Sequence, residues 1–182
     1  MERGGKKVRV AILLSDKIDF KTKAIKRDPG GHFIILKGRT HQEHTNIIYL
    51  YAPNIGAQKY IRKILEGFKK DIDSNTIILG DFNISLSKMD RSAKQNIRKN
   101  IVVFNNALDQ MDLTDTYRSF HSKEAKFTFF SNTHGIFSKI DYMIGHKTSL
   151  KKFKKIEIIL SIFSDPKGLK LETSVKEKLK NT

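Results

Sequence analysis

The sequence has 182 residues, enough for one domain with one sizeable core. No apolar stretch approaches the ~20 residues that span a bilayer, so no membrane partner is expected. It contains no cysteine, which excludes disulfides, thiolate metal sites and cysteine nucleophiles. With 35 Lys+Arg against 19 Asp+Glu, the formal net charge is +16, which favours a polyanionic partner such as nucleic acid. A soluble lysine-rich surface is the other explanation of this charge.

Strands dominate the predicted elements of the N-terminal part. Alternating apolar residues predict strands at residues 7–14, 32–37 and 46–51. Asp28-Pro29-Gly30-Gly31 predicts a turn between the first two. We expect these three strands to form an antiparallel meander.

Helices then alternate with further strands. Residues 56–72 place apolar side chains at helical spacing, and residues 76–79 read as a fully buried strand. A second helix is predicted at residues 93–111. The remaining predicted strands occupy residues 126–131, 138–145, 155–160 and 168–173. This order predicts an α+β fold with sheets inside and helices outside.

The chain reads as one domain with two short ends. The domain is expected at residues 8–175, between a polar lead at 1–7 and a basic tail at 176–182. The lead lacks the small-residue cleavage pattern of a secretory signal, so we expect an intracellular protein, nuclear or cytoplasmic. A monomer is expected.

Two loops after predicted strands carry groups that suit a phosphate. Tyr51-Ala52-Pro53-Asn54 offers the Tyr51 hydroxyl and the Asn54 amide as hydrogen-bonding groups. Gly80-Asp81-Phe82-Asn83 follows the buried strand, and Asp81 and Asn83 point the same way if the chain stays extended. A carboxylate beside an amide suits Mg²⁺ and a polarised water. Ordinary strand-ending turns are the alternative for both loops.

The C-terminal half adds polar residues at the ends of its predicted strands. They lie in the strings Phe127-Thr128-Phe129-Phe130-Ser131, Ser138-Lys139-Ile140-Asp141 and Ser164-Asp165-Pro166. With the two earlier loops and Asp112-Leu113-Thr114-Asp115, these strings resemble, in collinear order, the endonuclease domain of LINE-type (long interspersed element) retrotransposon proteins. That domain belongs to the endonuclease/exonuclease/phosphatase, or DNase I-like, superfamily.

The resemblance implies an incomplete four-layered DNase I-like sandwich, with two β-sheets face to face and helices outside, lacking its N-terminal strands. It also implies Mg²⁺-dependent hydrolysis of DNA phosphodiester bonds, in a protein that carries a reverse transcriptase farther along. Tyr51 would contact the scissile phosphate and Asp81 would activate water. Asn83 would hold the phosphate, and Asp141 would orient a catalytic histidine.

The remaining implied site residues concern DNA and metal. Asp165 would lie at the Mg²⁺ ion, and Thr128 would line the DNA path. Lys151 and Lys152 would contact flanking phosphates, unless they form a solvated charge run. We expect Asp81, Asp141 and Asp165 to converge and, by mutual repulsion, to raise at least one carboxyl pKa.

Two departures from the family pattern predict impaired catalysis. The family ends with Ser-Asp-His, whereas Pro166 follows Asp165 here, and loss of such a proton-transfer group typically costs about 10²–10⁴-fold in rate. None of the six histidines lies at a family catalytic position. The strand that carries the family's metal-binding Glu has no counterpart, so Mg²⁺ binding is expected to be weak. A non-catalytic nucleic-acid-binding remnant, a relic without activity and a phosphatase-like hydrolase are the alternatives.

Overall fold

The computed structural model describes residues 12, 14, 18–40, 43–92, 99–159 and 168–173. The predicted lead and tail, almost all of the predicted strand at 7–14, and the Ser164-Asp165-Pro166 string lie outside the described residues. Among the helices that the structure does describe, none has the length and apolar character needed to cross a membrane.

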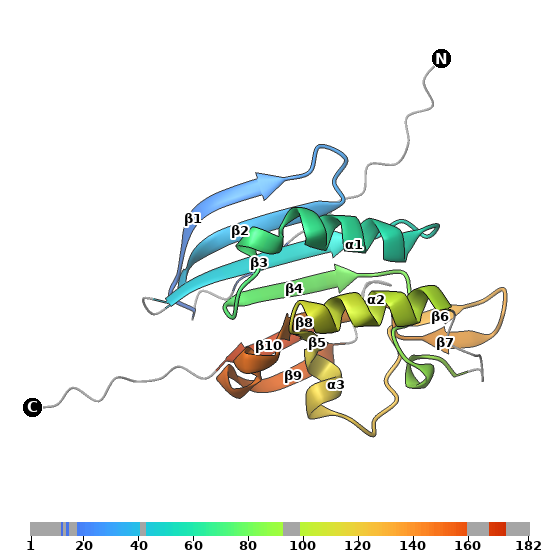
Figure 1. Ribbon diagram of the computed structural model, residues 1–182. Helices are drawn as coiled ribbons and strands as arrows, with labels where there is room; N and C mark the ends of the chain where they lie inside the picture. The colour runs from blue at the N-terminus through green and yellow to red at the C-terminus, as the bar shows by residue number, and fades with distance from the viewer. Residues whose placement is uncertain are drawn as a thin grey trace, which may run out of the picture.

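A six-stranded sheet forms the centre of the molecule, in the order β1-β2-β3-β4-β8-β5 (Figure 1). Its strands are β1 (Phe20–Arg27), β2 (Phe33–Thr40), β3 (Glu43–Tyr51), β4 (Thr76–Asp81), β8 (Asp141–His146) and β5 (Leu113–Asp115). The first three strands pair antiparallel as a meander, in which β2 and β3 correspond to the strands predicted at 32–37 and 46–51. β3 and β4 pair parallel, and β8 runs antiparallel to both β4 and β5.

The strand that enters the Asp28–Gly31 turn was not predicted. It is β1, at Phe20–Arg27. After its first residue, every side chain of β1 is exposed, because β1 is an edge strand. An exposed edge strand rich in lysine carries little apolar alternation, and lysines at such an edge discourage pairing with other chains.

The crossover between the parallel strands is α1 (Ala57–Gly67), followed by the short 3₁₀ helix η1 (Lys69–Asp71). Parallel strands require such a crossover, and here it covers one face of the sheet (Figure 1). Ile61 and Leu65 are buried beneath it, as the helical spacing predicted. The predicted helix at 56–72 is therefore confirmed, apart from its division into two pieces.

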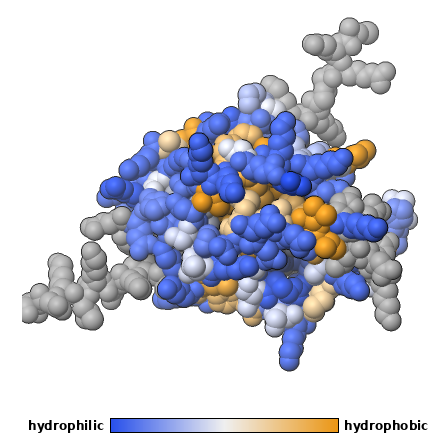
Figure 2. Space-filling model, in the orientation of Figure 1, coloured by the Kyte–Doolittle hydropathy of each residue, from blue (hydrophilic) through white to orange (hydrophobic). Residues whose placement is uncertain are grey.

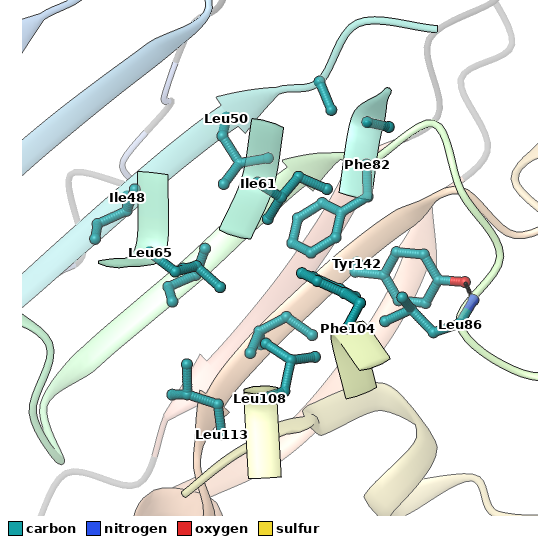
Figure 3. Close-up of a cluster of buried hydrophobic side chains, with 14 of the residues drawn as sticks. Ile48, Leu50, Ile61, Leu65, Phe82, Leu86, Phe104, Leu108, Leu113 and Tyr142 are labelled. Carbon is teal, nitrogen blue, oxygen red and sulfur yellow. Dashed lines mark hydrogen bonds between the residues drawn. The ribbon is translucent and has the colours of Figure 1, made fainter. Parts of the chain in front are cut away.

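The second helix, α2 (Lys99–Gln110), lies beside α1 on the same face. Figure 3 shows Phe104 and Leu108 of α2 facing the sheet, near Phe82 and Tyr142. The Phe82 and Tyr142 rings are 5.4 Å apart between centroids. This core lies directly behind the ends of β4 and β8, so it fixes the backbone from which Asp81 and Asp141 project.

A second, smaller core lies on the opposite face of the sheet. There β9 (Phe153–Ile159) pairs antiparallel with β10 (Gly168–Thr173). Phe153 and Ile156 of β9 pack with Met143 of β8 and Tyr117 of α3 (Thr116–Phe120). The two sheets are therefore stacked face to face with helices outside the larger one, which confirms the α+β sandwich.

Three short elements complete the described fold. They are η2 (Lys88–Asp90), the hairpin of β6 (Phe129–Ser131) and β7 (Ile136–Ser138), and η3 (Lys147–Lys152). The strand predicted at 138–145 is in fact divided, because Ser138 ends β7 and β8 begins only at Asp141. This break leaves Lys139 and Ile140 as a turn that leads into the sheet.

Candidate active site

Strand direction brings three predicted site residues to one end of the main sheet. The carboxyl ends of parallel β3 and β4 meet there, and the amino end of antiparallel β8 meets them. Tyr51 is paired with Asp81, and Asp81 is paired with Asp141. Directly opposed residues share a face, with Cβ atoms about 4.5–5.5 Å apart in an antiparallel pair. We call Tyr51, Asp81 and Asp141 the polar row.

Main-chain hydrogen bonds continue beyond the strands and hold this end closed. The Ala52 N–H donates to the Asp81 carbonyl at 2.8 Å, and the Phe82 N–H donates to the Ile140 carbonyl at 2.7 Å. Phe82 and Ala52 are fully buried. The three loops after β3, after β4 and before β8 are thus fixed to one another, which gives the polar row a rigid base.

Asn83 also lies beside Asp81, but strand alternation does not place it there. Its backbone has φ 51°, so the chain is not extended there and simple strand alternation does not apply. The Asn83 N–H donates to Asp81 Oδ1 at 2.8 Å, and its side-chain amide donates to the Ala52 carbonyl at 2.7 Å. The Asn83 side chain therefore ties the loop after β4 to the loop after β3.

Gly80 allows the close approach of β3 and β4. It adopts φ 140°, and a Cβ built there would overlap the carbonyl oxygen of Leu50 and lie 2.8 Å from its carbonyl carbon. The glycine is required by the neighbouring strand β3. It lets β3 and β4 close together just before Tyr51 and Asp81.

Thr128 is buried, with only 6% of its surface exposed, and it contacts the residues at the start of β8. Its Oγ1 accepts hydrogen bonds from the Ile140 N–H at 3.0 Å and the Asp141 N–H at 3.2 Å. Thr128 therefore positions the first residue of β8. Its contact with DNA stays a prediction.

Burial is the main influence on the acidity of Asp81. It raises the pKa of Asp81, and the hydrogen bond from the Asn83 N–H only partly opposes this. The pKa of Tyr49 is also raised, by burial first and then by the charges of Asp141 and Asp81. A raised carboxyl pKa was expected, but for Asp81 the leading cause is desolvation and not repulsion between acids.

The other predicted nucleic-acid contacts are divided between the two ends of the sheet. Asn54 is exposed in the loop that follows Tyr51. Lys151 and Lys152 lie in η3, where Lys152 Nζ donates to Glu43 Oε2 at 2.8 Å and to Asn75 Oδ1 at 2.6 Å. Asn75 precedes β4, so the structure places these lysines at the opposite end from the polar row.

Sequence reasoning missed two residues beside the polar row. Tyr49 precedes Tyr51 by two residues on the same face of β3, and the alternation of this strand could have found it. His32, the residue before β2, places its ring centroid 6.4 Å from that of Tyr51. No local pattern marks His32, because its position depends on the pairing register of β2 with β3.

The donor atoms of the polar row fit a Mg²⁺ ion that keeps most of its own water. Two facing carboxylates, Asp81 and Asp141, provide the hard oxygen ligands that this ion prefers. Within the described ranges no group of three or more His, Asp or Glu residues is arranged to hold a metal. Asp165, the predicted metal ligand, lies outside those ranges.

Comparison with known proteins identifies the fold. No family model matches the sequence. Among solved structures, the endonuclease domain of TRAS1, a telomere-specific non-LTR retrotransposon, superposes with a TM-score of 0.67 at 11% identity, over 91% of this chain and 73% of that one.

Two DNA-processing enzymes are similar to a comparable degree. An AP endonuclease from Archaeoglobus fulgidus gives a TM-score of 0.64 at 13% identity, over 86% of this chain and 72% of that one. A variant of the 3′ phosphatase NExo from Neisseria, bound to product DNA hairpin, gives 0.64 at 17% identity, over 88% and 71%. The chain therefore has the DNase I-like fold.

Proposed function

We propose that this chain is a DNA-binding domain of the retrotransposon endonuclease type, in which phosphodiester hydrolysis is impaired. The observation that carries the proposal is the polar row, in which Tyr51, Asp81 and Asp141 meet at one sheet end although they come from three separate segments. A hydroxyl, two carboxylates and the nearby Asn83 amide are groups that can bind a phosphate, a water and a cation.

Charge supports DNA as the polyanion. The chain carries a formal net charge of +16, and Figure 2 shows a largely hydrophilic surface on the helix-covered side. The positive charge attracts a phosphate backbone, whereas the carboxylates of the polar row repel it. A cation at Asp81 would resolve this conflict, because Mg²⁺ neutralises phosphate charge and polarises the bound water.

The β6–β7 hairpin supports contact with a nucleic acid beyond one phosphate. Phe129, Phe130 and Phe137 are each exposed by 43–46%, and the Phe130 and Phe137 rings are 4.5 Å apart. The hairpin lies toward the end of the sheet at which β4 ends (Figure 1), and Thr128 just before it binds the Asp141 main chain. Exposed aromatic rings beside a phosphate site can contact bases or sugars.

Impairment is proposed from the residue at position 166. Proline has no group that can donate a proton to the leaving oxygen or stabilise the charge that develops on the phosphate. The residues proposed to bind phosphate are thus present, whereas proline replaces the histidine that follows Ser-Asp in the resembling family.

DNA binding is the first test. Affinity of the full chain for a short fluorescein-labelled duplex, measured by anisotropy in EDTA, is expected to fall linearly on a log–log plot against salt concentration. The slope should be about −0.9 for each phosphate contacted. A scrambled duplex of equal length should bind equally well. Binding that is absent at low salt, or independent of salt, would remove DNA as the partner.

Supercoiled-plasmid nicking is the second test. With Mg²⁺, the native chain is expected to nick plasmid no faster than an Asp81→Ala control, since the group at position 166 is lost. A Pro166→His variant shows whether this loss alone limits the reaction. Native, Mg²⁺-dependent nicking that disappears in the Asp81→Ala control would show that catalysis is not impaired.

A further inference from the structure

The outer side of α1 and η1 carries an excess of positive charge. Together these two helices contain five basic and two acidic residues. Both acids are already paired. Glu66 Oε1 lies 2.7 Å from Arg62 Nε, and Asp71 Oδ1 lies 2.6 Å from the Nζ of Lys37 on β2. The four remaining basic residues, all exposed, are called the α1 face: Lys59, Lys63, Lys69 and Lys70.

The lysines of the α1 face have no carboxylate partner in the part of the chain that the structure describes. Lysines elsewhere differ in this respect. Lys147 Nζ lies 3.0 Å from the Asp109 carboxylate, and Lys155 Nζ lies 2.8 Å from that of Glu157. A neighbouring carboxylate cancels most of the attraction that an ammonium group exerts on a phosphate. The α1 face therefore attracts a polyanion more strongly than these paired lysines do.

Lys26 of the edge strand β1 extends the α1 face across the sheet. Its Nζ lies 5.0 Å from the centroid of the Phe68 ring, at the junction of α1 and η1. The Phe68 ring packs in turn against Phe33 of β2, with centroids 5.4 Å apart. The exposed Lys26 side chain thus lies on the same side of the sheet as the helices, and the positive charge covers two neighbouring elements.

The absence of apolar groups from the α1 face favours a nucleic acid over a protein or a membrane. Protein interfaces have an apolar core, and a helix that binds a membrane surface inserts apolar side chains. No large hydrophobic residue of α1 or η1 is exposed, because Ile61 and Leu65 face the sheet. Interfaces with DNA are polar and strongly positive. Figure 2 views this side of the molecule and shows it to be largely hydrophilic.

The polar row faces away from the α1 face. Ile48 and Leu50 of β3 are buried in the core that also contains the apolar side chains of α1. Side chains alternate along a strand, so Tyr51 projects from the opposite side of the sheet. Asp81 and Asp141 lie on that same side, because Tyr51 is paired with Asp81 and Asp81 with Asp141.

This geometry separates two possible positions for DNA. α1 lies over one face of the sheet, whereas the polar row lies at the sheet end where β4 ends (Figure 1). Duplex DNA is stiff, with a persistence length of about 150 base pairs. A short duplex at the polar row therefore cannot also bend onto the α1 face. DNA on the α1 face has to be a second segment.

We propose that the α1 face is a second DNA-binding surface, which lets one chain hold two duplex segments at once. The inference rests on the proposed function, since the first segment is the one assigned to the polar row. From Lys59 to Lys70 the helices extend about 17 Å, the length of about five nucleotides along one strand. Lysines contact phosphates and not base edges here, so this surface binds any sequence.

The test measures the mass of the complex by sedimentation velocity, with a labelled duplex of about 12 base pairs, roughly 40 Å long, in EDTA and low salt. With excess duplex, the native chain is expected to form a complex of one chain with two duplexes. A triple variant that combines Lys59→Gln, Lys63→Gln and Lys70→Gln should bind one duplex only. In the native chain, the second binding step should weaken with salt by a slope of about −0.9 for each phosphate contacted.

The matched control removes the same charge from paired lysines. It combines Lys21→Gln, Lys147→Gln and Lys155→Gln, each at a lysine that lies within 3.9 Å of a carboxylate. This variant has the net charge of the α1-face variant and should still bind two duplexes. Melting curves establish that both variants are folded.

The outcomes separate the second surface from the proposed function. Two duplexes on the α1-face variant, or one on each of the two variants, overturns the role of the α1 face. A single duplex on the native chain overturns the second surface, and the α1-face variant then shows where that duplex lies. Binding that this variant retains leaves the proposed function standing. Binding that it loses, or no DNA binding by the native chain, overturns the proposed function as well.

Discussion

Replacing Gly80 with alanine is expected to destabilise the fold by about 3–5 kcal/mol, a large part of the stability of an ordinary domain. Gly80 has φ 140°, a conformation that L side chains rarely adopt, and a Cβ there would overlap the Leu50 carbonyl. Leu50 is fully buried in the main core, so neither strand can move aside without opening that core.

Gly67→Ala is the matched control for this substitution. Gly67 ends α1, and a Cβ built on it meets nothing within 4 Å. Alanine there should stabilise the helix by about 0.5–1 kcal/mol, because glycine loses more backbone freedom on folding. Urea unfolding monitored by circular dichroism compares both variants with the native chain. A Gly80→Ala midpoint equal to the native one would contradict the close approach of β3 and β4.

The sequence predicted the elements whose apolar pattern is strong. The helix over 56–72 and the strand at 76–79 correspond to α1 and β4, and the strand predicted at 168–173 corresponds to β10. α1 and β4 each bury one face, so their apolar pattern is visible in the sequence. β1 was missed because an exposed edge strand leaves no such pattern.

Short elements were also missed. β5 and α3 have three and five residues, fewer than a periodic pattern requires. Their positions are decided by tertiary contacts, such as the hydrogen bond from Thr116 Oγ1 to the Met143 carbonyl at 2.7 Å. No local sequence pattern predicts that contact.

The site residues also differ in how far the sequence predicts their positions. Tyr51, Asp81 and Asp141 follow or begin recognisable strands, so their convergence could be predicted from strand ends. His32 depends on the pairing register, and the conformation of Asn83 depends on a left-handed backbone that no spacing rule describes. The place of Lys151 and Lys152 could not be predicted either, since a basic run in the sequence does not reveal at which end of the sheet it lies.

Lys139 is the clearest example of a role hidden from the sequence. It is fully buried, and its Nζ donates to Asp115 Oδ2 at 2.6 Å. The same atom lies 4.8 Å from the centroid of the Tyr117 ring and 4.5 Å from that of Tyr142. Burial raises the pKa of both phenols, that of Tyr117 to about 12, so both rings are neutral and Asp115 is the counter-ion.

This buried lysine supports the entry to β8. Its N–H donates to the Asp90 carbonyl at 2.7 Å, and its own carbonyl accepts from the Tyr142 hydroxyl at 3.0 Å. Asp90 is itself buried and binds Arg118 at 2.6 Å. Lys139 is therefore held by hydrogen bonds at both its main-chain N–H and its carbonyl. Asp141, two residues further along, follows directly from this fixed segment.

Lys139→Met is expected to destabilise the fold by about 3–5 kcal/mol, because it leaves the Asp115 carboxylate without its buried partner. The exposed pair of Lys147 and Asp109 is the control, and Lys147→Met should cost less than about 1 kcal/mol. Adding Asp115→Asn to Lys139→Met should recover part of the loss, since the uncompensated charge is then gone. Urea unfolding measures all four proteins. If Lys139→Met unfolds at the native midpoint, the buried pair does not hold this segment. The rigidity inferred for Asp141 would then have to come from Thr128 and from the hydrogen bond between Phe82 and Ile140.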